Sequence, residues 1–181
     1  MVDPVKNFAK VTVSLGYNAA ATSIVLSAGQ GALLPQPSSD GAFNLVWWNS
    51  TDYGDPSDDT NKEIVRCTAR STDTLTITRA QEGTSATVKN LSGKTYKMIL
   101  APTAKTITDL IAMITRETPS GTVNGSNDTF TLSHTPSLEQ IYVNGLLQKK
   151  TVAYNITGAT VTFTASYIPQ TGDILEAICV N

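Results

Sequence analysis

Few residues that could do chemistry occur in this 181-residue chain, and they are scattered. The one histidine, His134, lies in the segment LSHTPS, and the two cysteines, Cys67 and Cys179, lie far apart in strand-like runs. This set lacks the ligand spacing of a zinc site and offers no locatable Ser-His or Cys-His nucleophile. We therefore expect no catalytic residue, no metal and no cofactor. We interpret His134 as a turn residue bonded to backbone, and both cysteines as buried free thiols.

The acidic segment TDYGDPSDDTNKE, residues 51–63, is the best candidate for an ion site. Calcium takes about six to eight oxygen ligands from flexible carboxylates of this kind. The spacing departs from the EF-hand pattern, however, and aspartates beside proline and serine commonly bind their own backbone in turns. We favour a solvated turn. The carboxylates concerned are Asp52, Asp55, Asp58, Asp59 and Glu63.

Two adjacent tryptophans, Trp47 and Trp48, lie in the strand-like run FNLVWWNS. Neighbouring side chains of a strand point to opposite faces, so we expect one indole in the core. The other must lie at a subunit interface, under a loop or on a ligand platform. We favour a subunit contact over a carbohydrate platform.

The segment TITRAQEGTSAT, residues 76–87, reads as a strand that ends in a glycine turn. Gly83 supplies a turn conformation that other residues adopt only with strain. A guanidinium from Arg79 beside the amide of Gln81 and the carboxylate of Glu82 can tie the strand end to a neighbouring loop. We interpret these residues as a structural clasp within one domain, with a subunit contact as the alternative.

These residues must be positioned by β-strands. Hydrophobic residues make up 40% of the chain and charged residues only 15%, against about 25% in typical domains. Segments rich in Val, Ile and Thr alternate with turn residues in both halves of the chain, which is typical of antiparallel strands. The fold class we predict is mainly β, with two antiparallel β-sandwich-like domains joined by one short α-helix. The expected division is an N-terminal β domain over residues 1–101, a connecting helix over 102–118 and a small C-terminal β domain over 119–181.

Apolar residues in the connecting segment fall at the spacing i, i+3, i+4 and i+7, which predicts one stripe of an α-helix. A helix of this length does not persist alone in water, so its apolar face must lie on something. We expect the stripe to form a subunit interface. Its residues are Ile107, Leu110, Ile111 and Ile114.

The C-terminal segment repeats the strand pattern, with Asn144-Gly145 as a strong two-residue hairpin turn. A domain of about 60 residues is marginal for a hydrophobic core of its own. We therefore expect it to rest on the helix or on another subunit.

The overall charge excludes some classes of function. A net charge of −2 and a pI near 5.3 provide no basic surface for nucleic acid. No apolar run is long enough to span a bilayer, and the start MVDPVKNFAK lacks the features of a signal peptide. We expect a cytosol-like compartment, with neither nucleic acid nor membrane as partner.

The segments LTITRAQEGTSAT and GKTYKMILAPTAKTITDL together resemble a β module of tailed-bacteriophage virion proteins, in which a strand ending in Arg-x-Gln-Glu-Gly-Thr leads into a helical connection. The segment QIYVNGLLQKKTVAYNITGATVTFTASYIPQTGDILEAICV is similar to another phage module with an Asn-Gly hairpin and a late Gly-Asp. The matching residues are Arg79, Gln81, Glu82, Gly83 and Thr84 in the first module, and Asn144, Gly145, Tyr154, Gly158, Gly172 and Asp173 in the second.

This resemblance implies a structural protein of the virion rather than an enzyme. Its partners would be other tail, neck, head or fibre proteins and copies of itself, as a trimer or ring, in a particle assembled in the host cytoplasm. Fibre proteins of this kind continue into long repeats or a tip domain; this chain ends at Asn181, which favours an adaptor or a short decoration. The alternative is a carbohydrate-binding adhesin that uses Trp47, Trp48 and the acidic loop. A cell-wall hydrolase would need a facing pair of carboxylates, and none can be placed.

Overall fold

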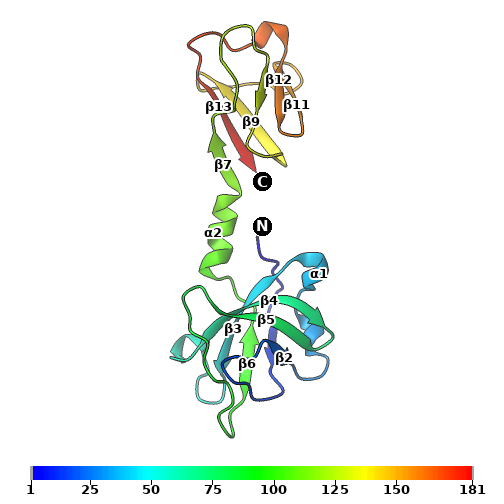
Figure 1. Ribbon diagram of the computed structural model, residues 1–181, viewed down its shortest axis with the longest axis vertical. Coiled ribbons are helices and arrows are strands. Elements are labelled where there is room, and N and C mark those ends of the chain that lie inside the picture. Colours follow the sequence, from blue (N-terminus) through cyan, green and yellow to red (C-terminus); the bar gives the residue numbers. More distant parts are fainter. Residues whose placement is uncertain (1, 181) are drawn as a thin grey trace. The chain divides into compact units, whose positions relative to one another are not determined.

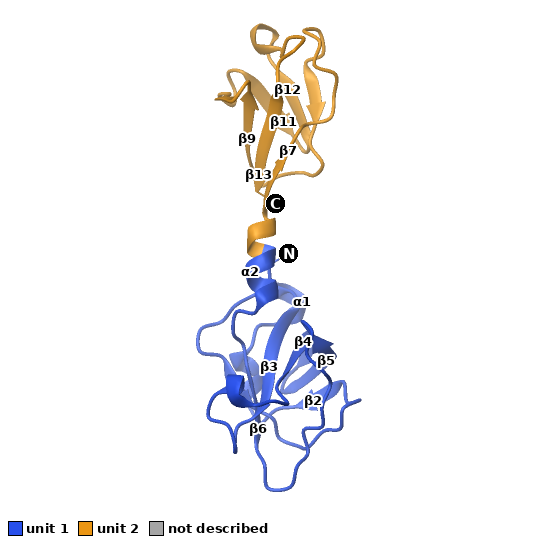
Figure 2. Cartoon of the chain, turned by 90° about the vertical axis from the view of Figure 1, so that its left-hand side faces the viewer, with its two compact units in different colours: residues 1–109 blue, residues 110–181 orange. Residues whose placement is uncertain are grey.

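The computed structural model describes residues 2–180, and this part of the chain is mainly β, with antiparallel sheets (Figure 1). The chain forms two compact units, unit 1 up to Asp109 and unit 2 from Leu110 (Figure 2). Each unit has its own hydrophobic core. Among the described residues, α2 (Ala104–Ala112) is the one helix longer than a single turn, and the boundary between the units falls inside it. The predicted fold class is confirmed.

Six strands of unit 1 form one sheet in the order β1-β6-β3-β4-β5-β2. The chain just after each outer strand joins the two edges: Val13 follows β1 and pairs with Leu26, which follows β2. This pairing closes the sheet on itself, and closure removes exposed strand edges that could pair with other chains. The strands are β1 (Lys10–Thr12), β2 (Ser23–Val25), β3 (Phe43–Asn49), β4 (Glu63–Ser71), β5 (Thr74–Gln81) and β6 (Tyr96–Ile99).

The core of unit 1 is built from the alternating inward residues of these strands. β3 differs from its neighbours because six of its seven residues are buried, on both faces. A strand that is covered on both faces has a continuous apolar sequence, such as FNLVWWN, instead of alternating apolar and polar residues. β3 is therefore the central strand on which the rest of unit 1 is arranged.

Short turns of helix fill the connections of unit 1: η1 (Gln30–Leu33), α1 (Pro37–Asp40) and η2 (Pro56–Asp58). The hairpin between β4 and β5 turns at Thr72 and Asp73, as its polar sequence predicts. The Asp73 carboxylate also accepts hydrogen bonds from the N–H groups of Gly29 (2.8 Å) and Gly31 (2.7 Å). The hairpin thus holds the start of η1 in place.

The connecting helix is shorter than the sequence indicates. α2 ends at Ala112, and Ile114 begins strand β7 (Ile114–Glu117), where it pairs with Val180. The prediction that Ile114 continues the helical stripe, in a helix over residues 102–118, is therefore wrong. The periodicity fits a helix equally well, but Ile and Thr suit a strand, and pairing with β13 decides the outcome.

Unit 2 is a sandwich of two small antiparallel sheets. One sheet has the order β10-β9-β13-β7 and the other β11-β12-β8. Large side chains of both sheets, such as Ile141 and Leu175 from the first and Phe130 and Tyr154 from the second, share one core between them. The remaining strands are β8 (Thr129–Thr131), β9 (Leu138–Val143), β10 (Leu146–Leu147), β11 (Tyr154–Thr157), β12 (Thr160–Phe163) and β13 (Leu175–Val180), and η3 (Ala165–Tyr167) follows β12.

The hairpin predicted at Asn144-Gly145 joins β9 to β10. Both residues have positive φ, 53° and 77°, which is the pattern of a type I′ turn. The Asn144 side chain also donates to Asp173 (2.7 Å) and accepts from the N–H of Ile174 (2.9 Å), so the turn is tied to the start of β13. Within residues 2–180, no helix has the length and apolarity that crossing a lipid bilayer takes.

Candidate functional site

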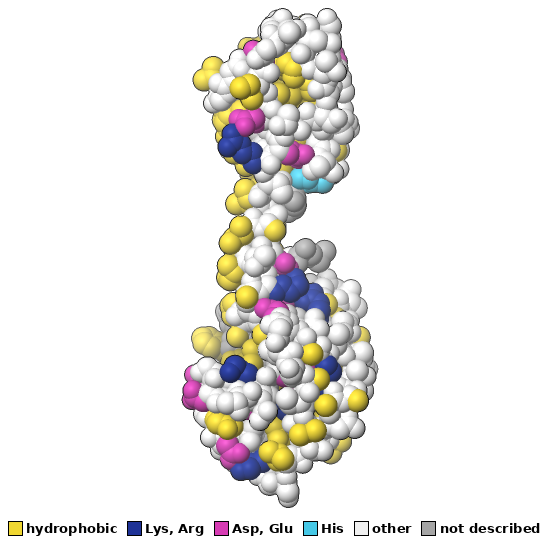
Figure 3. All heavy atoms as spheres, turned by 60° about the vertical axis from the view of Figure 1, so that its left-hand side comes forward, with side chains coloured by type: hydrophobic (Ala, Val, Ile, Leu, Met, Phe, Trp, Pro, Cys, Tyr) yellow, Lys and Arg dark blue, Asp and Glu magenta, His cyan; other side chains and the backbone are white. Residues whose placement is uncertain are grey.

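The connecting segment exposes an apolar stripe. Ile107, Leu110 and Ile111 lie on one face of α2 and are 51%, 55% and 68% exposed, and Ile114 at the start of β7 is 64% exposed. Figure 3 shows hydrophobic side chains gathered along this segment. Large exposed aliphatic side chains in a row, rather than singly, are typical of an interaction surface. We call Ile107, Leu110 and Ile111 the apolar stripe; Ile114 is exposed nearby in the sequence but belongs to β7.

The other face of α2 is polar. Lys105 and Asp109 form an ion pair one turn apart, and Thr108 bonds back to the carbonyl of Ala104 (2.9 Å). A nine-residue helix falls below the length of about 12–15 residues at which isolated helices become stable in water. α2 therefore depends on what holds its start and on what covers its stripe.

Unit 1 holds the start of α2 through Glu82. One oxygen of this carboxylate accepts the backbone N–H of Lys105 (3.0 Å) and the other accepts the side-chain amide of Asn44 (2.6 Å) on β3. Thr106 Oγ1 accepts the N–H of Thr103, which stands directly before the helix (3.2 Å). A carboxylate at the amino end of a helix also interacts favourably with the helix dipole. Glu82 thus fixes the first turn of the helix that carries the stripe.

Arg79 forms the second half of the clasp. Its Nε and Nη2 donate to the two oxygens of Glu63, at 2.7 and 2.6 Å, and Glu63 is fully buried. Further hydrogen bonds reach the carbonyls of Asn18 (3.0 Å) and Thr87 (2.8 Å). This bidentate geometry is the strongest form of the ion pair, and it ties β5 to β4 and to two loops. In this structure Arg79 acts inside unit 1.

A second buried cation, Lys89, lies 3.8 Å from Glu63. Its ammonium donates to the carbonyl of Asn61 (2.7 Å), and both cations lie over the Trp47 ring, at 5.0 Å for Arg79 and 5.7 Å for Lys89. Burial alone raises the pKa of Glu63, but hydrogen bonds from Arg79 and backbone N–H groups outweigh it and lower that pKa below its ordinary value. The buried carboxylate is therefore ionised and fully paired.

The other polar residues of the turn motif, Gln81 and Thr84, form hydrogen bonds with the backbone. Gln81 donates to the carbonyl of Arg79 (2.8 Å), and Thr84 Oγ1 accepts the N–H of Ile64 (3.0 Å). Gly83 has φ of +77°, and its neighbour Glu82 also has positive φ, at 50°. An unusual backbone at Glu82 aims its carboxylate at α2.

Both tryptophans are buried, at 0% and 2% exposure, which corrects the expectation that Trp47 or Trp48 contributes to an interface. Trp47 lies in the core, edge-to-face with Tyr17. Trp48 lies under the acidic loop and donates its Nε1–H to the carbonyl of Tyr53 (3.2 Å). Of the three expectations for the second indole, the covering loop is the one observed. Neither ring offers a platform for a sugar.

The acidic loop does not gather its carboxylates around one point. Asp52 pairs with Lys94 (2.5 Å), Asp55 caps the N–H of Ser57 (2.7 Å), and the buried Asp59 accepts the N–H of Asn49 (2.8 Å). Turn and loop contacts thus occupy these three carboxylates. Asp59 and Glu63 are buried, so the prediction of a solvated turn does not hold for them.

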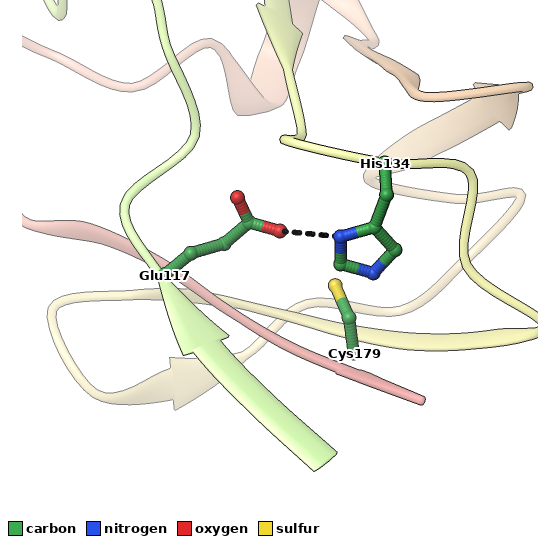
Figure 4. A group of neighbouring side chains, drawn as sticks. All are labelled: Glu117, His134 and Cys179. Carbon is green, nitrogen blue, oxygen red and sulfur yellow. Dashed lines mark ion pairs between the residues drawn. The ribbon is translucent and has the colours of Figure 1, made fainter. Parts of the chain in front are cut away.

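The structure brings together three residues that the sequence keeps apart: Glu117 at the end of β7, His134 in the loop after β8 and Cys179 in β13 (Figure 4). Their ligand atoms lie within 4.8 Å of one another. Glu117 Oε1 is 3.9 Å from His134 Nδ1, and Cys179 is fully buried beneath the ring. Spacings of 17 and 45 residues follow no metal motif, so only strand pairing of β7 with β13 reveals the group.

Comparison with known proteins identifies no family for this chain. No protein-family profile matches the chain, and no curated protein sequence matches it.

Proposed function

We propose that this chain is a structural protein of a tailed-bacteriophage virion, an adaptor or short fibre or decoration component of the tail, neck or head. It acts by assembling with copies of itself and by attaching to other virion proteins in the host cytoplasm. The exposed apolar stripe on α2 carries this proposal. The Arg-x-Gln-Glu-Gly-Thr turn supports it, because that motif holds the helix that presents the stripe.

Copies of the same chain are the best partners for the stripe. It consists of two isoleucines and a leucine, so its complement is another apolar surface without charge. Rotational symmetry about an axis along the helix places the same stripe of each copy against its neighbours. Spacing of three and four residues is also the spacing by which helices interlock side by side. A trimer or a ring meets these conditions.

The self-association is tested on the full chain by light scattering coupled to gel filtration. We expect an oligomer for the native protein and a monomer for Ile111→Asp, because the charge enters the centre of the apolar contact at a cost of several kcal/mol. Ala112→Asp is the matched control: it adds the same charge to the same turn of α2, at an exposed position off the stripe, and leaves the oligomer intact.

A native protein that is monomeric at all concentrations would refute the self-association. If Ile111→Asp and Ala112→Asp change the oligomeric state equally, the interface does not lie on the stripe. The place in the virion is tested separately, by pull-down of the tail, neck and head proteins encoded beside this chain's gene.

A further inference from the structure

Unit 2 contains a concentration of buried polar atoms that lack hydrogen-bond partners. Among the described residues of this unit there are three such atoms: Thr115 Oγ1, Glu117 Oε1 and His134 Nε2. Native proteins leave few buried polar atoms unpaired, and a cluster of them indicates a ligand such as a water or an ion. All three atoms belong to the Glu117–His134–Cys179 group or to its immediate neighbour.

Strand pairing explains why these side chains meet. Thr115 lies directly across from Cys179 in the pairing of β7 with β13, and Glu117 is two residues further along β7 on the same face. The loop after β8 brings His134 over this point (Figure 4). Thr115 and Glu117 face inward while Ile114 and Arg116 face solvent, as the alternation of a strand requires.

Neighbouring hydrogen bonds hold two of the three residues in place. Glu117 Oε2 accepts the backbone N–H of Ser133 (2.9 Å), and Ser133 Oγ contacts His134 Nδ1 (2.9 Å). These bonds orient the carboxylate and the imidazole and leave Glu117 Oε1 and His134 Nε2 unpaired. A metal-binding histidine is usually held through one ring nitrogen and binds the ion through the other. Here Nδ1 contacts Ser133 Oγ and faces Glu117 Oε1 at 3.9 Å, and Nε2 has no partner.

We propose that Glu117, His134 and Cys179 bind one zinc ion that fastens β7, the loop after β8 and β13 together. Thiolate, imidazole and carboxylate are the three ligand types that zinc takes in proteins, whereas calcium and magnesium prefer oxygen alone. Ligand atoms around a tetrahedral zinc stand about 3.3–3.8 Å apart, given bond lengths of about 2.0–2.3 Å. The observed separations of up to 4.8 Å therefore close onto the ion with small side-chain movements.

The size of unit 2 supplies the physical reason for such a centre. Domains of about 70 residues have small cores and often use a metal or disulfides as staples. The three ligands come from segments that are far apart in the chain, so one ion restrains much of the unit. Coordination would release the thiol proton of Cys179 to solvent, as it does for zinc-bound cysteines generally, and the two charges of the ion would balance those of the thiolate and of Glu117. Solvent completes the fourth position.

The test uses the full chain, expressed without a histidine tag and stripped of metal with a chelator. We expect zinc titration against a chromogenic competitor to show one site per chain. Cobalt(II) in place of zinc should give a thiolate charge-transfer band and the strong visible absorption of four-coordinate cobalt. Cys179→Ser should abolish the charge-transfer band and weaken zinc binding by more than the roughly 10- to 100-fold that loss of an outer partner causes.

Cys67→Ser is the matched control, because Cys67 is the other buried free thiol and lies in unit 1. It should leave zinc binding and the cobalt spectrum unchanged. Glu117→Gln keeps the shape of the side chain and should also weaken binding. If the native protein loaded with cobalt shows no thiolate band, the proposal is refuted. This outcome does not depend on whether any variant folds.

A second measurement localises the effect. Both tryptophans lie in unit 1, so tryptophan fluorescence follows the unfolding of that unit. Hydrogen exchange of peptides that cover β7 and β13 follows unit 2. Zinc should slow exchange in these peptides and leave the fluorescence transition unchanged. Equal effects on both units, or zinc binding that survives Cys179→Ser, would overturn the assignment.

Discussion

The two units treat a carboxylate oxygen that is shielded from solvent differently. In unit 1, Glu63 receives Arg79 and backbone N–H groups at hydrogen-bond distance, with Lys89 at 3.8 Å, so its charge is compensated by the protein itself. In unit 2, Glu117 accepts one backbone N–H, that of Ser133, and otherwise faces one histidine at 3.9 Å and one buried thiol. The pKa of the Cys179 thiol is raised to about 11 by burial and by the nearby negative charge of Glu117. The charge of Glu63 is thus compensated within unit 1, whereas Glu117 Oε1 has no hydrogen-bond partner in unit 2.

This difference indicates that different interactions determine the stability of the two units. A buried ion pair contributes little when compared with apolar packing, but removal of one partner leaves a charge without compensation. Unit 1 should therefore lose stability when one of the cations that pair with Glu63 is removed. Unit 2 should instead respond to its turns, its small core and the metal proposed above.

The largest expected effect is on unit 1. Arg79→Ala leaves Glu63 buried with Lys89 as its one nearby cation and should lower the free energy of unfolding by about 3–5 kcal/mol. Urea unfolding followed by tryptophan fluorescence measures this directly. Lys94→Ala is the control, because its pair with Asp52 is partly exposed and should change stability by about 0–1 kcal/mol. If the two variants lose equal stability, the buried network is not what distinguishes unit 1.

A smaller effect is expected at the β9–β10 turn of unit 2. Gly145 has φ of +77°, and no atom lies within 4 Å of where a Cβ would stand, so Gly145→Ala tests backbone strain alone. We expect a loss of about 1–2 kcal/mol in unit 2. Hydrogen exchange of the β9 and β13 peptides measures it, while tryptophan fluorescence stays unchanged. Gly145→Asn should cost less, since asparagine tolerates this conformation, and the reverse order would contradict the strain explanation.

The smallest expected effect is a change in the slope of stability with pH, measured relative to each variant's own stability at neutral pH, because Glu63→Gln also leaves Arg79 and Lys89 without their carboxylate. Because the pKa of Glu63 is lower in the folded state than in the unfolded chain, its stabilisation is present above the unfolded pKa and is lost as the pH falls through the folded one. Glu63→Gln should therefore flatten the acid side of the stability–pH profile of unit 1, by at most one proton or about 1.4 kcal/mol per pH unit. Tryptophan fluorescence between neutral and acidic pH measures the slope. An unchanged slope would assign the acid sensitivity to other carboxylates.

Much of the architecture was predictable because it depends on local chemistry. Alternating β-branched residues, the Thr72-Asp73 and Asn144-Gly145 turns and the apolar spacing on α2 each act over a few residues. The end of α2 was not predictable in this way. Ile114 fits either a helix or a strand, and the partner strand β13, more than 60 residues away, decides between them.

The candidate sites follow the same division. Residue types alone placed Ile107, Leu110 and Ile111 on one face of a helix and marked Arg79 and Glu82 as a clasp. Which groups they bind depended on the fold: Glu63 for Arg79, and the start of α2 for Glu82. Burial of Trp48 under the acidic loop likewise depends on a loop conformation that adjacent residues do not encode.

The sequence by itself determined the strand and turn content, the apolar stripe and the low charge of this protein, because these properties arise from neighbours along the chain. Only the tertiary structure decided where the helix stops, which tryptophan faces outward (neither does) and that Glu117, His134 and Cys179 meet. The physical reason is that strand pairing joins residues at any separation in the chain, and no local pattern records which strands will pair.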